Sequence, residues 1–304
     1  MCYAGAMSDE PRHHRALVEG VRIHWAELGQ GRATPMVLLH GLYDSHQTWK
    51  HVDHALAQDR RVLMPDLPGH GLSERPDASY ALAWYARVVA RWLASLGLEQ
   101  VDVVGHSFGG GVAQMLLLEC PERVRRLVLV ASGGLGREIR ASLRLASVPG
   151  VVESFGQPFM GFGTRLALRT QGGFTKEDIE ELATMNVERG SARAFARTVR
   201  DIIDWRGQRR SFVERMHEVA KLPPIAVFWG DRDTIIPAAH GRAFVESLDG
   251  VVFVPFAGCG HYLHREQPEA FARALHEFLD APSATPARLR ATGAAPQTAK
   301  ERHA

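Results

Sequence analysis

The sequence has few cysteines, no long apolar run and almost no net charge, and each shortage excludes a class of protein. Its 304 residues include three cysteines, Cys2, Cys120 and Cys259, none of them in a Cys-x-x-Cys spacing. Three cysteines cannot all pair within one chain, so neither a disulfide framework nor a zinc site is indicated, and we expect a reducing compartment, the cytoplasm. No apolar run approaches the roughly 18 residues that span a bilayer, so a membrane association is not expected.

The charge is nearly balanced. Lys plus Arg number 36 and Asp plus Glu number 34, which gives a formal net charge of +2. Binding to nucleic acid requires a concentrated basic surface, so a nucleic-acid partner is not expected. The apolar fraction of 45% and the charged fraction of 23% are typical of a folded globular chain. A chain of this length buries a sizeable core without a disulfide or a metal.

Strand and helix patterns alternate along most of the chain. Helical periodicity covers residues 79–96 and 109–120. An early strand at 21–25 alternates apolar and polar residues, whereas the later strands are short, mostly apolar runs: 36–39, 61–64, 101–104, 127–130, 225–229 and 251–254. This alternation predicts an α/β fold with a mostly parallel central sheet and helices on both faces.

Residues 133–222 interrupt the alternation with helical patterns and no convincing strand. Thr175 and Asp178 have the spacing of a capping box at the start of one such helix. We therefore predict a helical cap at 133–222, inserted between two strands and lying over the carboxyl ends of the sheet, where open α/β sheets bind ligands. The catalytic core would comprise residues 16–132 and 223–281, with a flexible tail at 1–15 and a disordered tail at 282–304.

The strongest motif is Gly105-His106-Ser107-Phe108-Gly109, a G-x-S-x-G sequence between a buried strand and a helix. Such a sharp turn lifts a serine hydroxyl clear of the sheet at the positive end of the helix dipole. Flanking glycines relieve the steric crowding of the turn. The context therefore predicts that Ser107 is a nucleophile.

A neutral serine near pH 7 needs a base, and the base needs an orienting acid. His261 follows the last predicted strand and is the candidate base. The segment after the preceding strand contains two candidate acids, Asp231 and Asp233. The resulting chain order of serine, acid and histidine is that of one particular fold.

Residues 16–281 resemble the α/β-hydrolase superfamily. The resemblance rests on five motifs: His40-Gly41 after a strand, Asp-Leu-Pro-Gly-His-Gly-Leu-Ser at 66–73, Gly-His-Ser-Phe-Gly-Gly at 105–110, Gly230-Asp-Arg-Asp233 with Pro237, and Gly-Cys-Gly-His261 with Glu266 and Pro268. It implies that Asp233 is the triad acid, whereas Asp231 better suits a helix cap. It also implies a cofactor-free, esterase-like serine hydrolase.

Attack on a carbonyl places negative charge on its oxygen, which preorganised backbone N–H groups stabilise. One donor is expected to be the N–H of Phe108, directly after the nucleophile. The other is expected in the loop after His40-Gly41, at the N–H of Leu42. The side chains of Leu42 and Phe108 can line the pocket at the same time.

Several other residues are better explained as structural. His40 and His70 are expected to form structural hydrogen bonds in loops that the family shares. His51 and His54 have an H-x-x-H spacing without a third ligand, so we expect surface histidines and no metal site. Cys259 lies near His261 without a base of its own and is expected to be a small packed residue.

The predicted cap contains 13 Arg and 2 Lys against 11 acidic residues, a local net charge of +4. Solvated helix faces explain this excess of positive charge. The alternative, functional interpretation is that the charge attracts an acidic substrate. Phe155, Phe159 and Phe162 alternate with glycines in the same region. They are candidates for lining an acyl or ring pocket, or for packing the cap onto the core.

The predicted function is hydrolysis of a carboxylic ester of a small or medium apolar acid, with a small ester-like molecule as the partner. Epoxide hydrolases of this fold use Asp where Ser107 stands. Hydrolysis of a carbon–carbon bond in a ring-cleavage product ranks second, because Tyr262 after Cys-Gly-His261 is similar to that family's closing motif, although that family favours Trp there. The same motifs are also compatible with a thioesterase and with a ligand-binding receptor that retains the fold.

Overall fold

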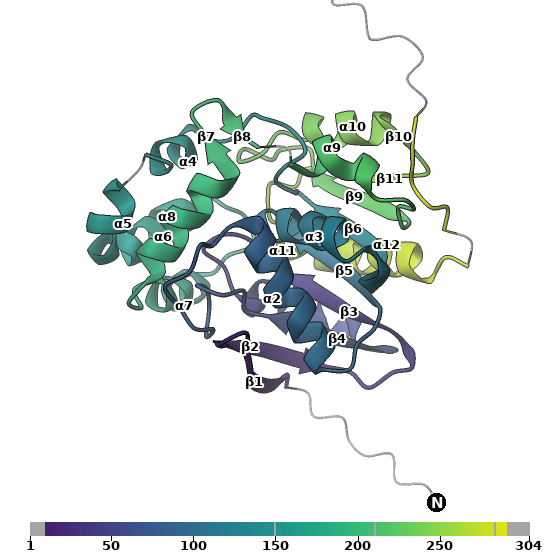
Figure 1. Ribbon diagram of the computed structural model, residues 1–304, viewed down its shortest axis with the longest axis horizontal. Coiled ribbons are helices and arrows are strands. Elements are labelled where there is room, and N and C mark those ends of the chain that lie inside the picture. The colour runs from purple at the N-terminus through teal and green to yellow at the C-terminus, as the bar shows by residue number, and fades with distance from the viewer. Residues whose placement is uncertain (1–9, 149, 210, 283, 291–304) are drawn as a thin grey trace, which may run out of the picture.

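The computed structural model describes residues 10–148, 150–209, 211–282 and 284–290. Within these residues eight strands form one sheet in the order β1-β2-β4-β3-β5-β6-β9-β11 (Figure 1). The strands are β1 (Arg12–Val18), β2 (Val21–Leu28), β3 (Ala33–Leu39), β4 (Arg60–Pro65), β5 (Val101–His106), β6 (Val124–Val130), β9 (Ile225–Gly230) and β11 (Val252–Phe256). The pairs from β4 to β11 are parallel, and only β1 and β2 run antiparallel to their neighbours. The predicted α/β class with a mostly parallel sheet is confirmed.

The central strands are buried on both faces, as their apolar runs predicted. Strand β2, which lies between β1 and β4, differs from the half-buried pattern expected of it, because His24 and Ala26 on its second face are buried as well. The ring of His24 forms a hydrogen bond to the carboxylate of Asp66. A polar residue can therefore occupy this interior position at low cost, since its hydrogen bond is made.

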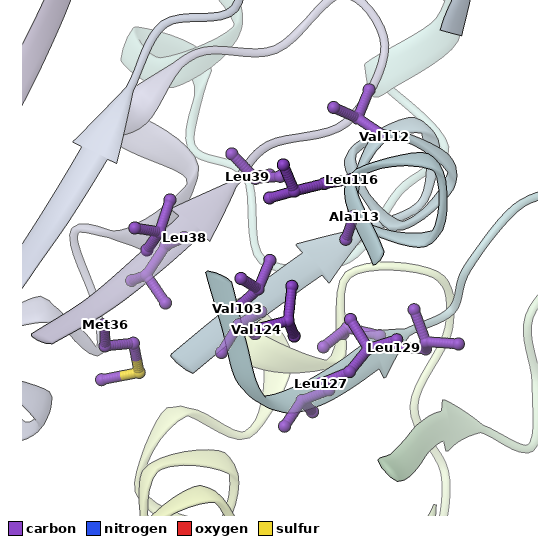
Figure 2. Close-up of a cluster of buried hydrophobic side chains, with 14 of the residues drawn as sticks. Met36, Leu38, Leu39, Val103, Val112, Ala113, Leu116, Val124, Leu127 and Leu129 are labelled. Atoms are coloured by element: carbon purple, nitrogen blue, oxygen red, sulfur yellow. The ribbon is translucent and has the colours of Figure 1, made fainter. Parts of the chain in front are cut away.

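The core helices are α1 (Asp53–Leu56), α2 (Leu82–Ser95), α3 (Phe108–Glu119), α10 (Ala239–Glu246), α11 (Leu263–Glu266) and α12 (Pro268–Asp280), with the short 3-10 helices η1 (His46–Trp49), η2 (Pro121–Arg123) and η4 (Met216–Glu218). Helices α2 and α3 pack together on one face of the sheet, and α12 packs with α1 on the other (Figure 1). Figure 2 shows buried side chains at the contact of α3 with the sheet: Val112, Ala113 and Leu116 come from α3, and Leu39, Val103, Leu127 and Leu129 come from β3, β5 and β6.

The inserted segment is helical, as predicted, and its helices between residues 141 and 202 gather on one side of the sheet (Figure 1). It contains α4 (Ala141–Ala146), α5 (Val151–Phe155), η3 (Gln157–Phe159), α6 (Met160–Leu168), α7 (Lys176–Asn186), α8 (Ser191–Ile202) and α9 (Ser211–Arg215). Thr175 and Asp178 form the predicted capping box of α7. A short hairpin, β7 (Ile203–Asp204) with β8 (Gly207–Gln208), was not predicted. Helix α9 packs against α3, so the chain returns to the core before residue 222.

Both predicted tails are too long. The expected N-terminal tail ended at residue 15, but β1 begins at Arg12 and pairs with β2 over its whole length. The expected C-terminal tail began at residue 282, but β12 (Arg288–Leu289) pairs with β10 (Leu248–Asp249), and Ala287 is buried. Edge strands lack the alternating apolar pattern that marks a half-buried strand, so both were missed. The rest of the two tails, 1–9 and 291–304, lies outside the described residues. Within the described residues, no helix is long and apolar enough to cross a membrane.

Candidate active site

The turn between β5 and α3 holds Ser107 in a strained backbone conformation, with φ 52° and ψ −114°. A positive φ at a residue with a side chain costs of the order of 1–3 kcal/mol and persists only where the surroundings enforce it. Here the Ser107 N–H donates to the carbonyl of Val130 at 2.9 Å, and its own carbonyl accepts from the N–H of Gly133 at 3.0 Å. The neighbouring strand therefore holds the serine at the carboxyl end of the sheet.

Two glycines permit this turn because backbone occupies the space of a side chain. A Cβ on Gly109 would lie 2.3 Å from the carbonyl oxygen of Leu39, and a Cβ on Gly105 would lie 2.5 Å from that of Gly109. We expect Gly109→Ala to lower the free energy of unfolding by about 3 kcal/mol, because the backbone must move to admit the methyl group.

Urea denaturation would measure this change, and Gly111→Ala in the same helix is the matched control. A Cβ on Gly111 would meet Leu82 at 3.5 Å, an ordinary contact. Alanine is the better helix former, so Gly111→Ala should raise stability by about 0.5–1 kcal/mol. Equal stability of the two variants would contradict the steric account of the turn.

The structure brings the three predicted triad residues together. His261 Nε2 lies 2.9 Å from Ser107 Oγ, and His261 Nδ1 lies 2.8 Å from Asp233 Oδ2. The second carboxylate oxygen, Asp233 Oδ1, accepts the N–H groups of Ile235 and Ile236 at 2.8 and 3.0 Å. The carboxylate is thus fixed by the backbone on one side and holds the imidazole on the other.

The choice between the two aspartates follows from their partners. Asp231 accepts the N–H of Gly258 at 2.8 Å and braces the loop before the histidine. Of these two described aspartates, Asp233 is the one that forms a hydrogen bond to His261, so the geometry agrees with the acid that the resemblance implied. The side chains of both Asp233 and His261 are almost fully buried, at 0% and 4% exposed. Water therefore competes little for the hydrogen bond between them.

His106, to which the sequence assigned no role of its own, supports the base. Its Nε2–H donates to the backbone carbonyl of His261 at 3.0 Å. Burial holds the pKa of His106 well below its usual range, and the charge of His261 adds to this effect. His106 is therefore neutral, and it fixes the backbone of His261 without competing for the proton of Ser107.

A cavity of about 410 Å³ opens beside Ser107, between the core and the inserted helices. The core contributes Leu42, Tyr43, Ser107, Ile235, His261 and Tyr262, and the cap contributes Arg140, Ser142, Leu143, Gly163, Thr164, Leu166, Ala167, Leu168, Thr170 and Gln171. A mostly apolar cavity of this size with a few polar groups is typical of a small-molecule site. Residues of the inserted segment and of the core thus line the same cavity beside the nucleophile.

The expected oxyanion donors lie next to the nucleophile. Phe108 is the first residue of α3, directly after Ser107, and Leu42 lines the same cavity. A Cβ placed on Gly41 would lie 3.5 Å from Ser107 Cβ, so the loop before Leu42 runs against the serine. Their action as donors remains a prediction.

The three cap phenylalanines do not line the cavity, and this prediction is wrong. Phe155, Phe159 and Phe162 are 73%, 66% and 65% exposed and lie on the outer surface. Phe155 and Phe159 belong to α5 and η3, neither of which lines the cavity, and Phe162 on α6 is exposed although Gly163, Thr164, Leu166, Ala167 and Leu168 of the same helix line it. Composition therefore identified one helix of the cavity wall, α6, but not the residues of that helix that line the cavity.

The loop histidines are structural, as predicted. His40 bonds through Nδ1 to the carbonyl of Gly41 at 2.8 Å, and its Nε2 accepts the N–H of Leu67 at 2.9 Å. His70 bonds through Nδ1 to the carbonyl of Pro68 at 3.1 Å. Burial lowers the pKa of His70 to about 3, so it stays neutral near pH 7.

The remaining expectations concern surface and packed residues. His51 and His54 lie on the surface, as predicted. Cys259 is buried in the main core. Burial raises the pKa of its thiol to about 11, so the thiolate that would act as a nucleophile does not form near pH 7.

A serine at a strand-to-helix turn, with its acid and base supplied after two later strands of a parallel sheet, is the arrangement of the α/β hydrolases. The chain belongs to that family: the α/β hydrolase fold family matches residues 34–268. The family relation that the five motifs implied is thereby confirmed.

Individual relatives cover most of the chain. An uncharacterized protein of Mycobacterium tuberculosis is 32% identical over 274 residues, 86% of this chain and 80% of the relative. The 2-hydroxymuconate semialdehyde hydrolase of Pseudomonas putida is 31% identical over 263 residues, 82% of this chain and 88% of the relative. The crystal structure of Cfl2 from Burkholderia cenocepacia superimposes with a TM-score of 0.74 at 26% identity, covering 89% of this chain and 96% of that one.

Proposed function

We propose that the protein is a serine hydrolase that cleaves carboxylic esters of small or medium apolar acids. The observation that carries this proposal is the chain of hydrogen bonds from Asp233 through His261 to Ser107, which ends in a mostly apolar cavity. The Ser107 hydroxyl, at the end of these hydrogen bonds, is the group that can attack a bound carbonyl.

In the proposed reaction, Ser107 Oγ attacks the ester carbonyl while His261 Nε2 accepts its proton. Asp233 keeps the proton-bearing Nδ1 oriented and stabilises the imidazolium. The N–H groups of Leu42 and Phe108 stabilise the oxyanion. His261 then protonates the leaving alkoxide, and an acyl-enzyme remains. A water molecule, deprotonated by His261, hydrolyses it.

A panel of p-nitrophenyl esters of increasing acyl length tests the proposal. The cavity of about 410 Å³ should favour short to medium chains, so kcat/KM should fall for long acyl groups. A fluorophosphonate probe should label the protein, and peptide mass spectrometry should place the label on Ser107. An unlabelled, folded protein without turnover would instead support the ligand-binding receptor.

Hydrolysis of a carbon–carbon bond is the second candidate, and Arg140 is the observation that favours it. Arg140 lines the cavity, and among the described residues no carboxylate forms an ion pair with it. A guanidinium so placed can bind the carboxylate of a dienoate ring-cleavage product. The 2-hydroxymuconate semialdehyde hydrolase of Pseudomonas putida is among the relatives. A visible-absorbance assay on a coloured dienoate would show bleaching if this reaction occurs.

Replacing Arg140 with glutamine separates the two candidates. A charge-assisted hydrogen bond contributes about 1.5–3 kcal/mol, so Arg140→Gln should lower kcat/KM for a carboxylate-bearing dienoate by about 10- to 100-fold. For a neutral ester the same variant should change kcat/KM less than about threefold. Arg144→Gln, at an exposed position outside the cavity, is the matched control. Equal losses for both substrates would show that Arg140 does not recognise charge.

A further inference from the structure

The loop between α6 and α7 joins the wall of the active-site cavity to the helix that follows the catalytic histidine. Gln171 lines the cavity, and Gly172 and Gly173 come directly after it. A Cβ on Gly172 would lie 2.7 Å from Glu266 Cδ, and a Cβ on Gly173 would lie 2.6 Å from Arg265 Cβ. This loop of the cap therefore packs directly against α11.

Arg265 binds the same loop through its side chain. Its Nε donates to the carbonyl of Gly173 at 2.9 Å, and its Nη2 donates to Asp178 Oδ2 at 2.6 Å. Its Nη1 donates to the carbonyl of Gln47 at 3.3 Å. Gly173 and Asp178 belong to the cap, whereas Gln47 lies in η1 of the core. The guanidinium thus connects the start of α7 to η1 and α11.

The ion pair between Arg265 and Asp178 is almost fully buried, with side chains 1% and 4% exposed. Water therefore competes little for its hydrogen bond. Asp178 has two further partners, because it accepts the N–H of Thr175 at 2.9 Å and forms an ion pair with Lys50. Replacing Arg265 therefore loosens the cap without leaving the Asp178 carboxylate unpaired.

The same helix fixes the backbone on both sides of the catalytic base. The N–H groups of Arg265 and Glu266 donate to the carbonyl of Tyr262 at 2.8 and 3.0 Å. The Glu266 carboxylate accepts the N–H of Gly260 at 3.0 Å. His261 lies between these two contacts. The residues that hold the cap loop therefore also hold the segment of the base.

Tyr262 lines the cavity and packs against the cap. Its ring meets the ring of Phe174 edge-on, with centroids 4.7 Å apart. It shares a small buried cluster with Leu168 and Leu182 of the cap. The guanidinium of Arg265 lies 4.2 Å above the ring of Phe174. Core and cap residues of this part of the cavity wall are therefore held in place by contacts that lead to Arg265.

We propose that Arg265 is a positioning residue that determines substrate specificity. By holding the loop at 171–173 against α11, it fixes the cavity wall beside His261 and limits the length of the acyl group that the protein accepts. Arg265 does not line the cavity, so it acts through Tyr262 and the cap loop. This inference rests on the proposed ester hydrolysis. Without Arg265 the wall can yield, and a long acyl group that presses on the wall gains more than a short one.

The first test is Arg265→Gln, with kcat/KM measured for p-nitrophenyl butyrate and p-nitrophenyl decanoate. The ratio of the two values, decanoate over butyrate, should rise at least about fivefold, because specificity is a difference in transition-state binding. Partial unfolding lowers both values by one factor and leaves their ratio unchanged. Arg265→Lys keeps the charge but not the planar set of donors, so its ratio should lie between those of the parent and Arg265→Gln.

Hydrogen exchange followed by peptide mass spectrometry tests the same contact without a substrate. In Arg265→Gln the backbone amides of residues 168–178 should exchange at least about tenfold faster than in the parent, because charge-assisted hydrogen bonds to the cap are lost. If the parent hydrolyses neither ester, the proposed function fails, and the exchange rates alone then decide whether Arg265 holds the cap loop.

Arg165→Gln is the matched control. Arg165 pairs with Glu180 at 2.6 Å, an exposed ion pair that joins α6 to α7 within the cap. Its loss should change the ester ratio and the exchange rates of residues 168–178 less than about twofold. The proposal is overturned if Arg265→Gln keeps the parent ratio, if its exchange rates in residues 168–178 match those of the parent, or if Arg165→Gln shifts both measurements equally.

Discussion

Ser107→Ala should lower kcat for p-nitrophenyl esters by about 10⁴- to 10⁶-fold. The hydroxyl is the atom that His261 Nε2 faces at 2.9 Å, and alanine leaves no group that can form the acyl-enzyme. Any residual rate would come from substrate binding and the oxyanion donors acting on water. Steady-state kinetics with the best ester of the panel would measure the loss, and fluorophosphonate labelling should disappear with it.

Ser142→Ala is the matched control, because Ser142 lines the same cavity but has no part in the hydrogen-bond chain. It should retain activity within about threefold and keep its label at Ser107. Circular dichroism and thermal melting of both variants would separate a lost nucleophile from a lost fold. Turnover by Ser107→Ala at the parent rate would refute the assignment of the nucleophile.

The turn at Ser107 could be predicted from sequence because its determinants are local. Strand, glycines, serine and helix follow one another within about 20 residues, and the steric requirement at Gly109 permits few other residues. Placing Asp233 required the resemblance, since periodicity alone does not separate it from Asp231. The hydrogen bonds of the two carboxylates make that distinction in the structure.

The cap residues that line the cavity could not be predicted from sequence, because the cap helices have apolar residues both in the cavity wall and on the exposed surface. Phe159 and Phe162 are exposed, whereas Thr164 and Leu168 of the same helical segment face the cavity. Pattern reasoning assumes that large apolar side chains point inward, and that assumption fails on this surface. Arg140 was not predicted as a site residue, because the cap contains many arginines and the sequence does not mark one of them. Its position in the Ser107 cavity depends on how the cap folds over the core.

The edge strand β1 also could not be predicted from the sequence. Residues 12–18 form β1 through hydrogen bonds to β2, a strand pairing that leaves little apolar signal in an exposed edge. His13 thereby comes within 2.9 Å of His24, eleven residues later. A side-chain contact across two strands has no fixed spacing in the sequence, so it can be found only after the register is known.

Asp233→Asn should lower kcat by about 10⁴-fold while leaving the fold intact. The side-chain oxygen of asparagine can still accept the N–H groups of Ile235 and Ile236, which then turns its NH₂ toward His261 Nδ1. A donor at that position requires Nδ1 to be unprotonated, so the proton moves to Nε2. The imidazole then presents N–H to Ser107 and cannot accept its proton.

Asp231→Asn is the matched control for this tautomer argument. Asp231 accepts only the N–H of Gly258 among the hydrogen bonds of the described residues, and an amide oxygen can accept it equally well. Its kcat should therefore stay within about threefold of the parent value, with a comparable Tm. Steady-state kinetics of both variants on one ester would decide between the two acids. A large loss in Asp231→Asn with little change in Asp233→Asn would reverse the assignment, because the acid that fixes the tautomer would then be Asp231.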